Sequence, residues 1–158
     1  MSKITLEKVL EDRAVITNKI VPLAAATLAV TKALHEGNII SVSKADGSTL
    51  TLPNASGGGD QYNVFVNTTI TSVGLIVKVA NASDTMVGGA TVWSDNAADA
   101  VTHFKAGGTD DTITLNGTTS GGYAGMMVKL IDIGLNLWFV EIIGKATGVE
   151  ITPFSATV

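Results

Sequence analysis

The chain of 158 residues contains no cysteine. Disulfide bonds, thiolate nucleophiles and the usual structural zinc sites are therefore excluded together. Proline is also scarce, with three residues, whereas glycine is frequent, with 17. This balance favours many short strands joined by tight turns. Stability is expected to come from packing and from contacts between subunits.

Charged side chains are the second shortage. They make up 15% of the sequence, against about 25% in an ordinary globular protein, while hydrophobic residues make up 46%. A surface with so few charges favours burial against other subunits. The net charge of −4 and the lack of any lysine and arginine cluster argue against a nucleic-acid partner, which needs a basic face.

Long hydrophobic runs are missing as well. No uninterrupted apolar segment approaches the roughly 20 residues that a membrane-spanning helix requires. The N-terminus is not expected to be a signal peptide, because charged residues interrupt its apolar positions from Lys3 to Arg13. We therefore expect a protein that is made in the cytoplasm and has no membrane partner.

The first twenty residues hold a disproportionate share of the charges and differ from the rest of the chain. Their apolar residues Ile4, Leu6, Val9 and Leu10 would form a stripe along a short helix. A helix this short is marginal in isolation. The segment is either a simply packed terminus or an arm whose four apolar side chains contact a partner or a neighbouring subunit.

The sequence predicts two parts, an N-terminal arm of residues 1–26 and a β domain of residues 27–158. Residues 21–26 are interpreted as a connection, because Pro22 restricts the residue before it and the small residues that follow offer little to bury. From Thr27 onward the hydrophobic period is two, which predicts strands.

Ten short strands are predicted in the β domain, which favours an all-β sandwich or jelly-roll-like fold. They are Thr27–Val30, Asn38–Ser43, Ser48–Leu52, Tyr62–Val66, Leu75–Ala80, Ala90–Trp93, Thr102–Lys105, Thr112–Leu115, Met126–Asp132 and Leu137–Ile143. The last is apolar on nearly both faces, which is typical of a central strand or of one covered by another subunit. No fixed period predicts a solenoid or a propeller.

Local signals predict the connections. Asp46-Gly47 and Asn116-Gly117 are typical of tight hairpins, and the glycines at 57–59 of a looser hairpin loop. Residues 31–36 are expected to form one helical turn that Gly37 ends.

The sequence offers no group of residues with recognisable catalytic spacing. His35 and His103 are far apart, have no carboxylate at metal-ligand spacing, and are expected to be surface or turn residues. His35 could also meet free carbonyl groups at the end of its helical turn. The glycines at 57–59 lack the Lys-Ser/Thr and the helix of a phosphate-binding loop. We therefore expect no enzyme activity and no cofactor.

Two acidic loops offer oxygen atoms to a cation without following an EF-hand pattern. One contains Asp95, Asn96 and Asp99, and the other contains Asp110 and Asp111. Solvated loops are the expected outcome for both.

The aromatic residues allow two interpretations. Trp93, Trp138, Tyr62, Tyr123 and the phenylalanines would line a sugar-binding face if several were exposed together. Each lies in or beside a predicted strand, so a place in the core or in a subunit interface is favoured.

Several segments, taken in this order, resemble the small head decoration or cement proteins of tailed bacteriophages. They are 34–37 (LHEG), 50–53 (LTLP), 57–62 (GGGDQY), 75–80 (LIVKVA) and 111–117 (DTITLNG), followed by Trp138, Gly148 and Pro153-Phe154. The resemblance spans roughly residues 27–158. Comparable strand patterns also occur in phage tail and fibre modules.

The resemblance implies a structural role in the virion. It implies a non-catalytic protein that binds the major capsid protein on the outer capsid surface, stabilises the shell and forms a homotrimer. It makes the arm an anchor or a subunit-swapped segment, with Ile4, Leu6, Val9 and Leu10 as the contacts to the capsid or to another subunit. The alternative is a tail, fibre or carbohydrate-binding module that contacts a host surface.

Overall fold

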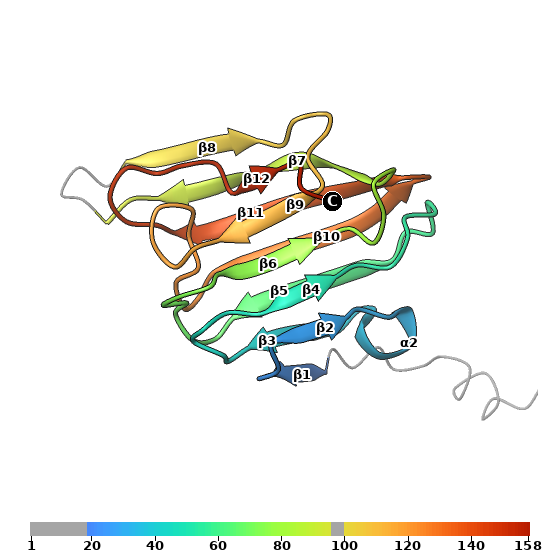
Figure 1. Ribbon diagram of the computed structural model, residues 1–158, viewed down its shortest axis with the longest axis horizontal. Helices are drawn as coiled ribbons and strands as arrows, with labels where there is room; N and C mark the ends of the chain where they lie inside the picture. Colours follow the sequence, from blue (N-terminus) through green and yellow to red (C-terminus); the bar gives the residue numbers. More distant parts are fainter. Residues whose placement is uncertain (1–18, 96–99) are drawn as a thin grey trace, which may run out of the picture.

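The computed structural model describes residues 19–95 and 100–158. Within them lie twelve β-strands and one helical turn, and the strands form two mixed sheets that pack face to face (Figure 1). The prediction of an all-β sandwich is confirmed. The four contact residues predicted in the arm, Ile4, Leu6, Val9 and Leu10, lie outside the described residues.

The larger sheet has seven strands. In spatial order they are β1 (Ile20–Leu23), β3 (Ile39–Val42), β5 (Gln61–Val66), β10 (Met127–Gly134), β11 (Leu137–Lys145), β7 (Thr85–Trp93) and β8 (Val101–Lys105). The smaller sheet has five, in the order β12 (Phe154–Ser155), β9 (Thr112–Leu115), β6 (Leu75–Lys78), β4 (Thr49–Thr51) and β2 (Thr27–Ala29). The helical turn α2 (Lys32–His35) precedes Gly37, which has a φ of 68°, as predicted.

The first six strands alternate between the two sheets. β1, β3 and β5 pair in parallel in the larger sheet, and β2, β4 and β6 pair in parallel in the smaller one. Residues 20–78 therefore wind through three coils of a flattened solenoid. The coils differ in length, since Ile20 pairs with Ile39 and Ile39 with Asn63, which are steps of 19 and 24 residues. Unequal coils leave no fixed period in the sequence.

The second half of the chain completes both sheets, and all of its strand pairs except β11–β7 are antiparallel. β10 pairs antiparallel with β5, and β11 continues the sheet beside it. β7 then pairs parallel with β11, and β8 forms the far edge. β11 is thus a central strand, as its apolar sequence indicates.

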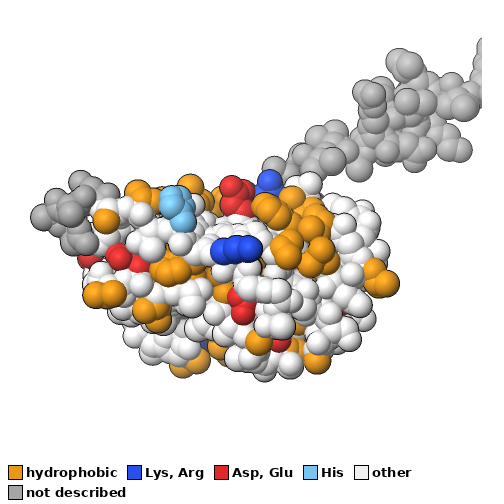
Figure 2. Space-filling model, turned by 90° about the horizontal axis from the view of Figure 1, so that it is seen from above, with side chains coloured by type: hydrophobic (Ala, Val, Ile, Leu, Met, Phe, Trp, Pro, Cys, Tyr) orange, Lys and Arg blue, Asp and Glu red, His pale blue; other side chains and the backbone are white. Residues whose placement is uncertain are grey.

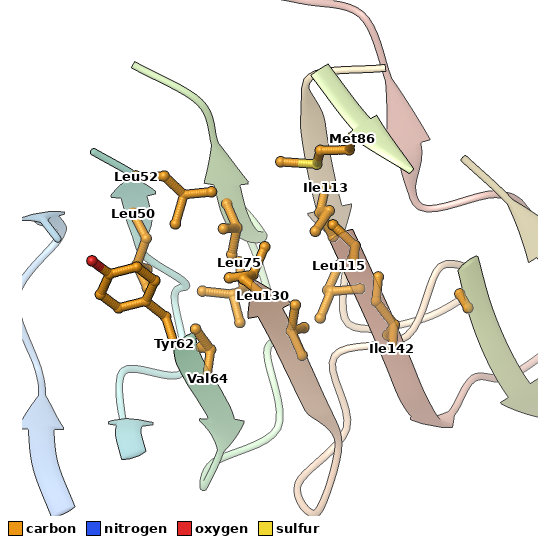
Figure 3. Close-up of a cluster of buried hydrophobic side chains, with 14 of the residues drawn as sticks. Leu50, Leu52, Tyr62, Val64, Leu75, Met86, Ile113, Leu115, Leu130 and Ile142 are labelled. Atoms are coloured by element: carbon orange, nitrogen blue, oxygen red, sulfur yellow. The ribbon is translucent and has the colours of Figure 1, made fainter. Parts of the chain in front are cut away.

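The core lies between the sheets and is built from the alternate residues of each strand. Figure 3 shows Leu50, Leu75 and Ile113 of the smaller sheet facing residues of the larger sheet such as Tyr62 and Leu130. All five are essentially inaccessible to solvent. The Tyr62 and Trp138 rings are tilted against each other with 5.8 Å between their centroids. The period of two predicted this inward set directly.

The structure contains two strands that were not predicted from the sequence. One of them lies in a segment that was assigned to the N-terminal arm. Residues 20–23, interpreted as part of a connection, form the edge strand β1, whose Leu23 is buried. Pro22 is tolerated there because an edge strand has one side without ladder bonds. The predicted boundary at residue 26 is therefore wrong, and the β domain already includes residues 20–26. The two-residue strand β12 at the other end was also missed.

The predicted hairpin at Asp46-Gly47 is a turn of a different kind. The turn forms, with the Gly47 N–H donating to the Lys44 carbonyl oxygen at 3.0 Å. It connects β3 in the larger sheet with β4 in the smaller one, so the two strands do not pair. Glycine is required at position 47, because φ is 93° and a Cβ atom would lie 2.0 Å from the Gly74 carbonyl oxygen.

The other two predicted hairpins are also turns between strands of different sheets that do not pair with each other. The loop at 57–59 joins β4 to β5, and the Asn116-Gly117 loop joins β9 to β10, so each passes from the smaller sheet to the larger one. Asn116 organises its loop by accepting hydrogen bonds on Oδ1 from the N–H groups of Thr118 and Ser120, at 2.9 and 3.1 Å. The turn chemistry was recognised correctly, but the partner of the following strand was not.

Candidate interaction surface

The outer faces of the two sheets differ in chemistry. The smaller sheet presents mostly threonine to the outside, together with a lysine, an alanine and an isoleucine. The residues, which follow the alternation of its four longer strands, are Thr27, Ala29, Thr49, Thr51, Ile76, Lys78 and Thr114. Short polar side chains of this kind are well hydrated.

The larger sheet presents a mainly apolar outer face, here called the apolar face. Its members lie on all seven strands, at positions that alternate with the inward-facing ones, and are Ile20, Ile39, Phe65, Trp93, Val101, Met127, Ile131, Phe139 and Ile143. Ile20 is 69% exposed and Ile143 is 49% exposed. Figure 2, which views the sandwich from above relative to Figure 1, shows hydrophobic side chains in several groups on that side of the molecule, with lysine, acidic and histidine side chains among them. A monomer seldom leaves this much apolar surface on one sheet.

Two hollows lie on the apolar face. The first, here called the β1–β5 hollow, has a volume of about 300 Å³ and lies at the β1 edge. It is lined by Ile20, Ile39, Ser41, Phe65, Asn67 and Met127. The register explains its shape, because Ser41 lies between Pro22 and Phe65 in one cross-strand row and its short side chain leaves space.

The second hollow, here called the Gly89 hollow, has a volume of about 410 Å³ and lies over β11, β7 and β8. Gly89 forms its floor, and in the same cross-strand row Glu141 lies on one side and Lys105 on the other. Phe139 and His103 also line it. A Cβ atom on Gly89 would lie 2.6 Å from the Phe104 carbonyl oxygen, so the close approach of β8 excludes a side chain there.

The structure separates the aromatic residues into two groups. Trp138 and Tyr62 are completely buried, and burial raises the pKa of the Tyr62 hydroxyl to about 12. Trp93, Phe65 and Phe139 instead lie on the apolar face, where Trp93 is 42% exposed. The core interpretation therefore holds for some of the aromatic residues, and a surface role is open to the others.

The two histidines have different surroundings. His103 is exposed on β8, as expected, and its Nδ1 lies 3.1 Å from Thr91 Oγ1. His35 lies in the helical turn α2, one of the two expected positions, but it is buried there, with 4% of its surface exposed. Its Nδ1 accepts a hydrogen bond at 2.9 Å from the N–H of Thr31, the residue before α2. The imidazole ring therefore contacts Thr31 at the start of the helical turn, whereas the sequence had suggested contacts with carbonyl groups at the end of the turn.

The glycine-rich loop at 57–59 takes part in an anion cradle that the sequence interpretation missed. The N–H groups of Ser56, Gly57 and Gly58 donate to the Asp132 carboxylate at 2.6 to 3.1 Å, and Ser56 Oγ donates at 2.9 Å. Asp132 lies on β10 and is 2% exposed. Burial alone would raise the pKa of Asp132, but these hydrogen bonds outweigh it and hold the pKa below its usual value. The loop therefore binds a carboxylate of its own chain.

The second acidic loop is also engaged by the chain itself. Asp111 accepts hydrogen bonds from the N–H groups of Thr157 and Val158, at 2.8 and 3.1 Å, and from Thr112 Oγ1 at 2.7 Å. Asp110 accepts a hydrogen bond at 2.6 Å from the N–H of Gly107. These carboxylates fix the C-terminal residues and a turn. The expectation of solvated loops is thus wrong for Asp111, which is buried.

The first acidic loop lies partly outside the described residues. Of its three members only Asp95 is described, and a hydrogen bond from the Thr147 side chain lowers the pKa of that carboxyl. Among residues 19–95 and 100–158, no group of three or more His, Asp or Glu residues is placed to hold a metal ion. In the same residues no helix is long and apolar enough to cross a membrane.

Comparisons with known proteins identified no relative of this chain. No family model matches the chain, and neither the curated proteins nor the solved structures gave a significant match. The candidate site therefore rests on the geometry of the apolar face. The sequence contained a signal for the apolar face, since β5 and β11 have apolar residues at both odd and even positions and therefore on both sides of the strand. Only the structure shows that these strands lie in one sheet.

Proposed function

We propose that the protein is a non-catalytic structural component of a tailed-phage virion, which binds the outer capsid surface and stabilises the shell. The observation that carries the proposal is the apolar face, which runs across the larger sheet while the opposite face of the sandwich is polar. One-sided apolar surfaces of this kind fit a protein that works in an assembly. The resemblance to head decoration proteins supplies the kind of assembly.

The proposed mechanism is mechanical. A protein that binds neighbouring subunits of the assembled shell stabilises the assembled state by mass action, and no covalent step is required. The partners are the major capsid protein and further copies of the chain, with a homotrimer as the expected state. A trimer contacts several shell subunits at once, so modest affinity at each contact is sufficient.

The test is the copy number of the protein in purified virions, measured against the major capsid protein by quantitative mass spectrometry. A ratio within a few-fold of one supports a decoration protein that covers the lattice. A few copies for each particle would instead assign the protein to a tail, fibre or vertex. Complete absence from particles would overturn the virion role.

A second candidate function is favoured by the Gly89 hollow. Phe139 supplies an aromatic surface there, and Glu141, His103 and Lys105 surround it with hydrogen-bonding groups. Sugar rings bind to sites that combine an apolar surface with a few placed polar groups. A carbohydrate-binding module of a tail or fibre would use this hollow.

Titration of host-cell polysaccharide into the full chain tests this second candidate. Binding that Phe139→Ala and Glu141→Gln each weaken at least tenfold supports it, with Thr51→Ala on the opposite face as the matched control. Binding that is absent, or that both variants leave unchanged, rules it out.

A further inference from the structure

We propose that the β1–β5 hollow binds residues 4–10 of a second copy of the chain. The hollow is suited to apolar side chains, because Ile39, Phe65 and Met127 line it and none of the residues that line it is charged. Its volume of about 300 Å³ is sufficient for several aliphatic side chains.

The chain itself carries a segment of matching chemistry. Ile4, Leu6, Val9 and Leu10 lie within seven positions, and the segment joins the described residues at Lys19, directly beside the hollow. Burial of four aliphatic side chains against an apolar surface is favourable in proportion to the area removed from water. Every copy therefore brings one hollow and one segment that fits it.

The direction of the chain favours a second copy as the source of the segment. Lys19 is fixed in the sheet, because its N–H donates to Asn38 Oδ1 at 3.0 Å and its carbonyl accepts from the N–H of Ile39 at 2.9 Å. From Ile20 the hollow extends in the direction of β1, toward Ser41 and Asn67. At Lys19 the N-terminal side of the backbone therefore points away from the hollow.

A return to the same hollow would need the chain to reverse its direction between Leu10 and Lys19. Binding to a second copy needs no such reversal. The nine steps from Leu10 to Lys19 span up to about 30 Å when extended. That distance is sufficient to reach a neighbouring copy.

Exchange of the segment from copy to copy is a head-to-tail contact. Contacts of this type close into a ring when the rotation between copies allows it, and a trimer is the smallest ring beyond a dimer. The inference rests on the self-association in the proposed function. It requires no capsid, so it is tested on the purified protein alone.

The first experiment measures the oligomeric state of the full chain by analytical ultracentrifugation. We expect the unsubstituted chain to be oligomeric at micromolar concentration. The double variant L6D/V9D and the single variant Ser41→Lys should each weaken association at least tenfold. Thr51→Lys, a matched change on the opposite face, should leave association unchanged. An unsubstituted chain that is monomeric, or an oligomer that survives L6D/V9D, overturns the inference.

The second experiment identifies which copy supplies the segment. The chain has no cysteine, so single cysteines can be introduced without interference. A mixture of Leu6→Cys and Ser41→Cys proteins should form a cross-linked dimer on mild oxidation, and a mixture of Leu6→Cys and Thr51→Cys should not. A chain that carries both Leu6→Cys and Ser41→Cys should form linked multimers. If that chain closes only on itself, or if no link forms, the exchange is wrong.

The two experiments also separate this inference from the proposed function. Thermal unfolding followed by circular dichroism checks that Ser41→Lys remains folded. If the segment does not bind the hollow but the protein is abundant in virions, the exchange fails and shell binding stands.

Discussion

Asp132 illustrates how a single carboxylate is accommodated in this core. It occupies an inward position of β10, after Val128 and Leu130, where an apolar residue is the rule. The N–H groups of the 56–58 loop compensate its charge, and no cation takes part among the described contacts. The glycines at 57 and 58 bring the backbone close enough to donate. The side chain therefore links β10 to a loop that lies more than 70 residues earlier in the chain.

Replacing Asp132 by asparagine should destabilise the protein by about 2–3 kcal/mol, because the amide NH₂ group cannot accept the hydrogen bonds that the second carboxylate oxygen accepts now. Urea unfolding followed by circular dichroism measures the change. Asp46→Asn, an exposed carboxylate with one lysine partner, is the control and should cost little. A stability equal to that of the original protein would show that the cradle contributes nothing.

The same residue predicts an acid dependence of stability. The pKa of Asp132 is lowered in the folded state, so its contribution is present above the unfolded pKa of about 3.9 and is lost as pH falls through the folded value. The free energy of unfolding should therefore decline below about pH 4, and the decline should be smaller in Asp132→Asn. Equal acid profiles for the two proteins would contradict this assignment.

At the residue scale, the sequence supports part of this account. The period of two in β10 places Asp132 on the inward side, so a buried carboxylate was predictable. Its partner was not, because hydrogen bonds across 75 residues depend on which loop the fold brings there. The burial of His35 was not predictable for the same reason, since burial of a short helical turn depends on the neighbouring strands.

At the element scale, β1 shows why a weak local pattern can hide a strand. Pro22 and the short apolar stretch indicate a connection, yet pairing with β3 supplies the hydrogen bonds that make these residues a strand. Asp-Gly and Asn-Gly turns were located correctly, and their strands were assigned to the wrong partners. A turn signal specifies that the chain reverses, whereas sheet membership depends on the later strands.

Two truncations test the corrected boundary. Removal of residues 1–18 should change the free energy of unfolding by less than about 0.5 kcal/mol when both proteins are compared as monomers in dilute solution, since the described sheets remain complete. Removal of residues 1–26 also removes β1 and buried Leu23, and should cost at least about 2 kcal/mol. Chemical unfolding of both proteins measures the difference. Equal stability of the two truncated proteins would show that β1 does not belong to the domain.

The C-terminal residues provide a second test at this scale. Deletion of Thr157 and Val158 removes two N–H donors from the buried Asp111 carboxylate, which is then left with fewer partners. We expect a loss of about 1–3 kcal/mol, measured by thermal and urea unfolding. Thr157→Ala retains both N–H groups and is the control. If the deletion lowers the free energy of unfolding no more than Thr157→Ala does, the hydrogen bonds from Thr157 and Val158 to Asp111 do not contribute to stability.

At the scale of the whole molecule, the contrast between the two outer faces determines how association should respond to salt. Contacts made by the apolar face are little screened by ions, unlike contacts between surface charges. Raising sodium chloride from about 0.05 M to about 0.5 M should therefore change the self-association constant less than about threefold. Analytical ultracentrifugation over this range measures it. A tenfold weakening would assign association to charged residues.

The position of β10 between β5 and β11 has a consequence for synthesis on the ribosome. β5 is exposed along one edge until residues 127–134 have emerged, and β7 lacks its β11 neighbour until residue 145. The N-terminal coils thus leave the ribosome with an unpaired strand edge, which is prone to pairing with other chains. The larger sheet cannot close before residue 145 has emerged, so slow translation of residues 127–145 would expose nascent chains to aggregation.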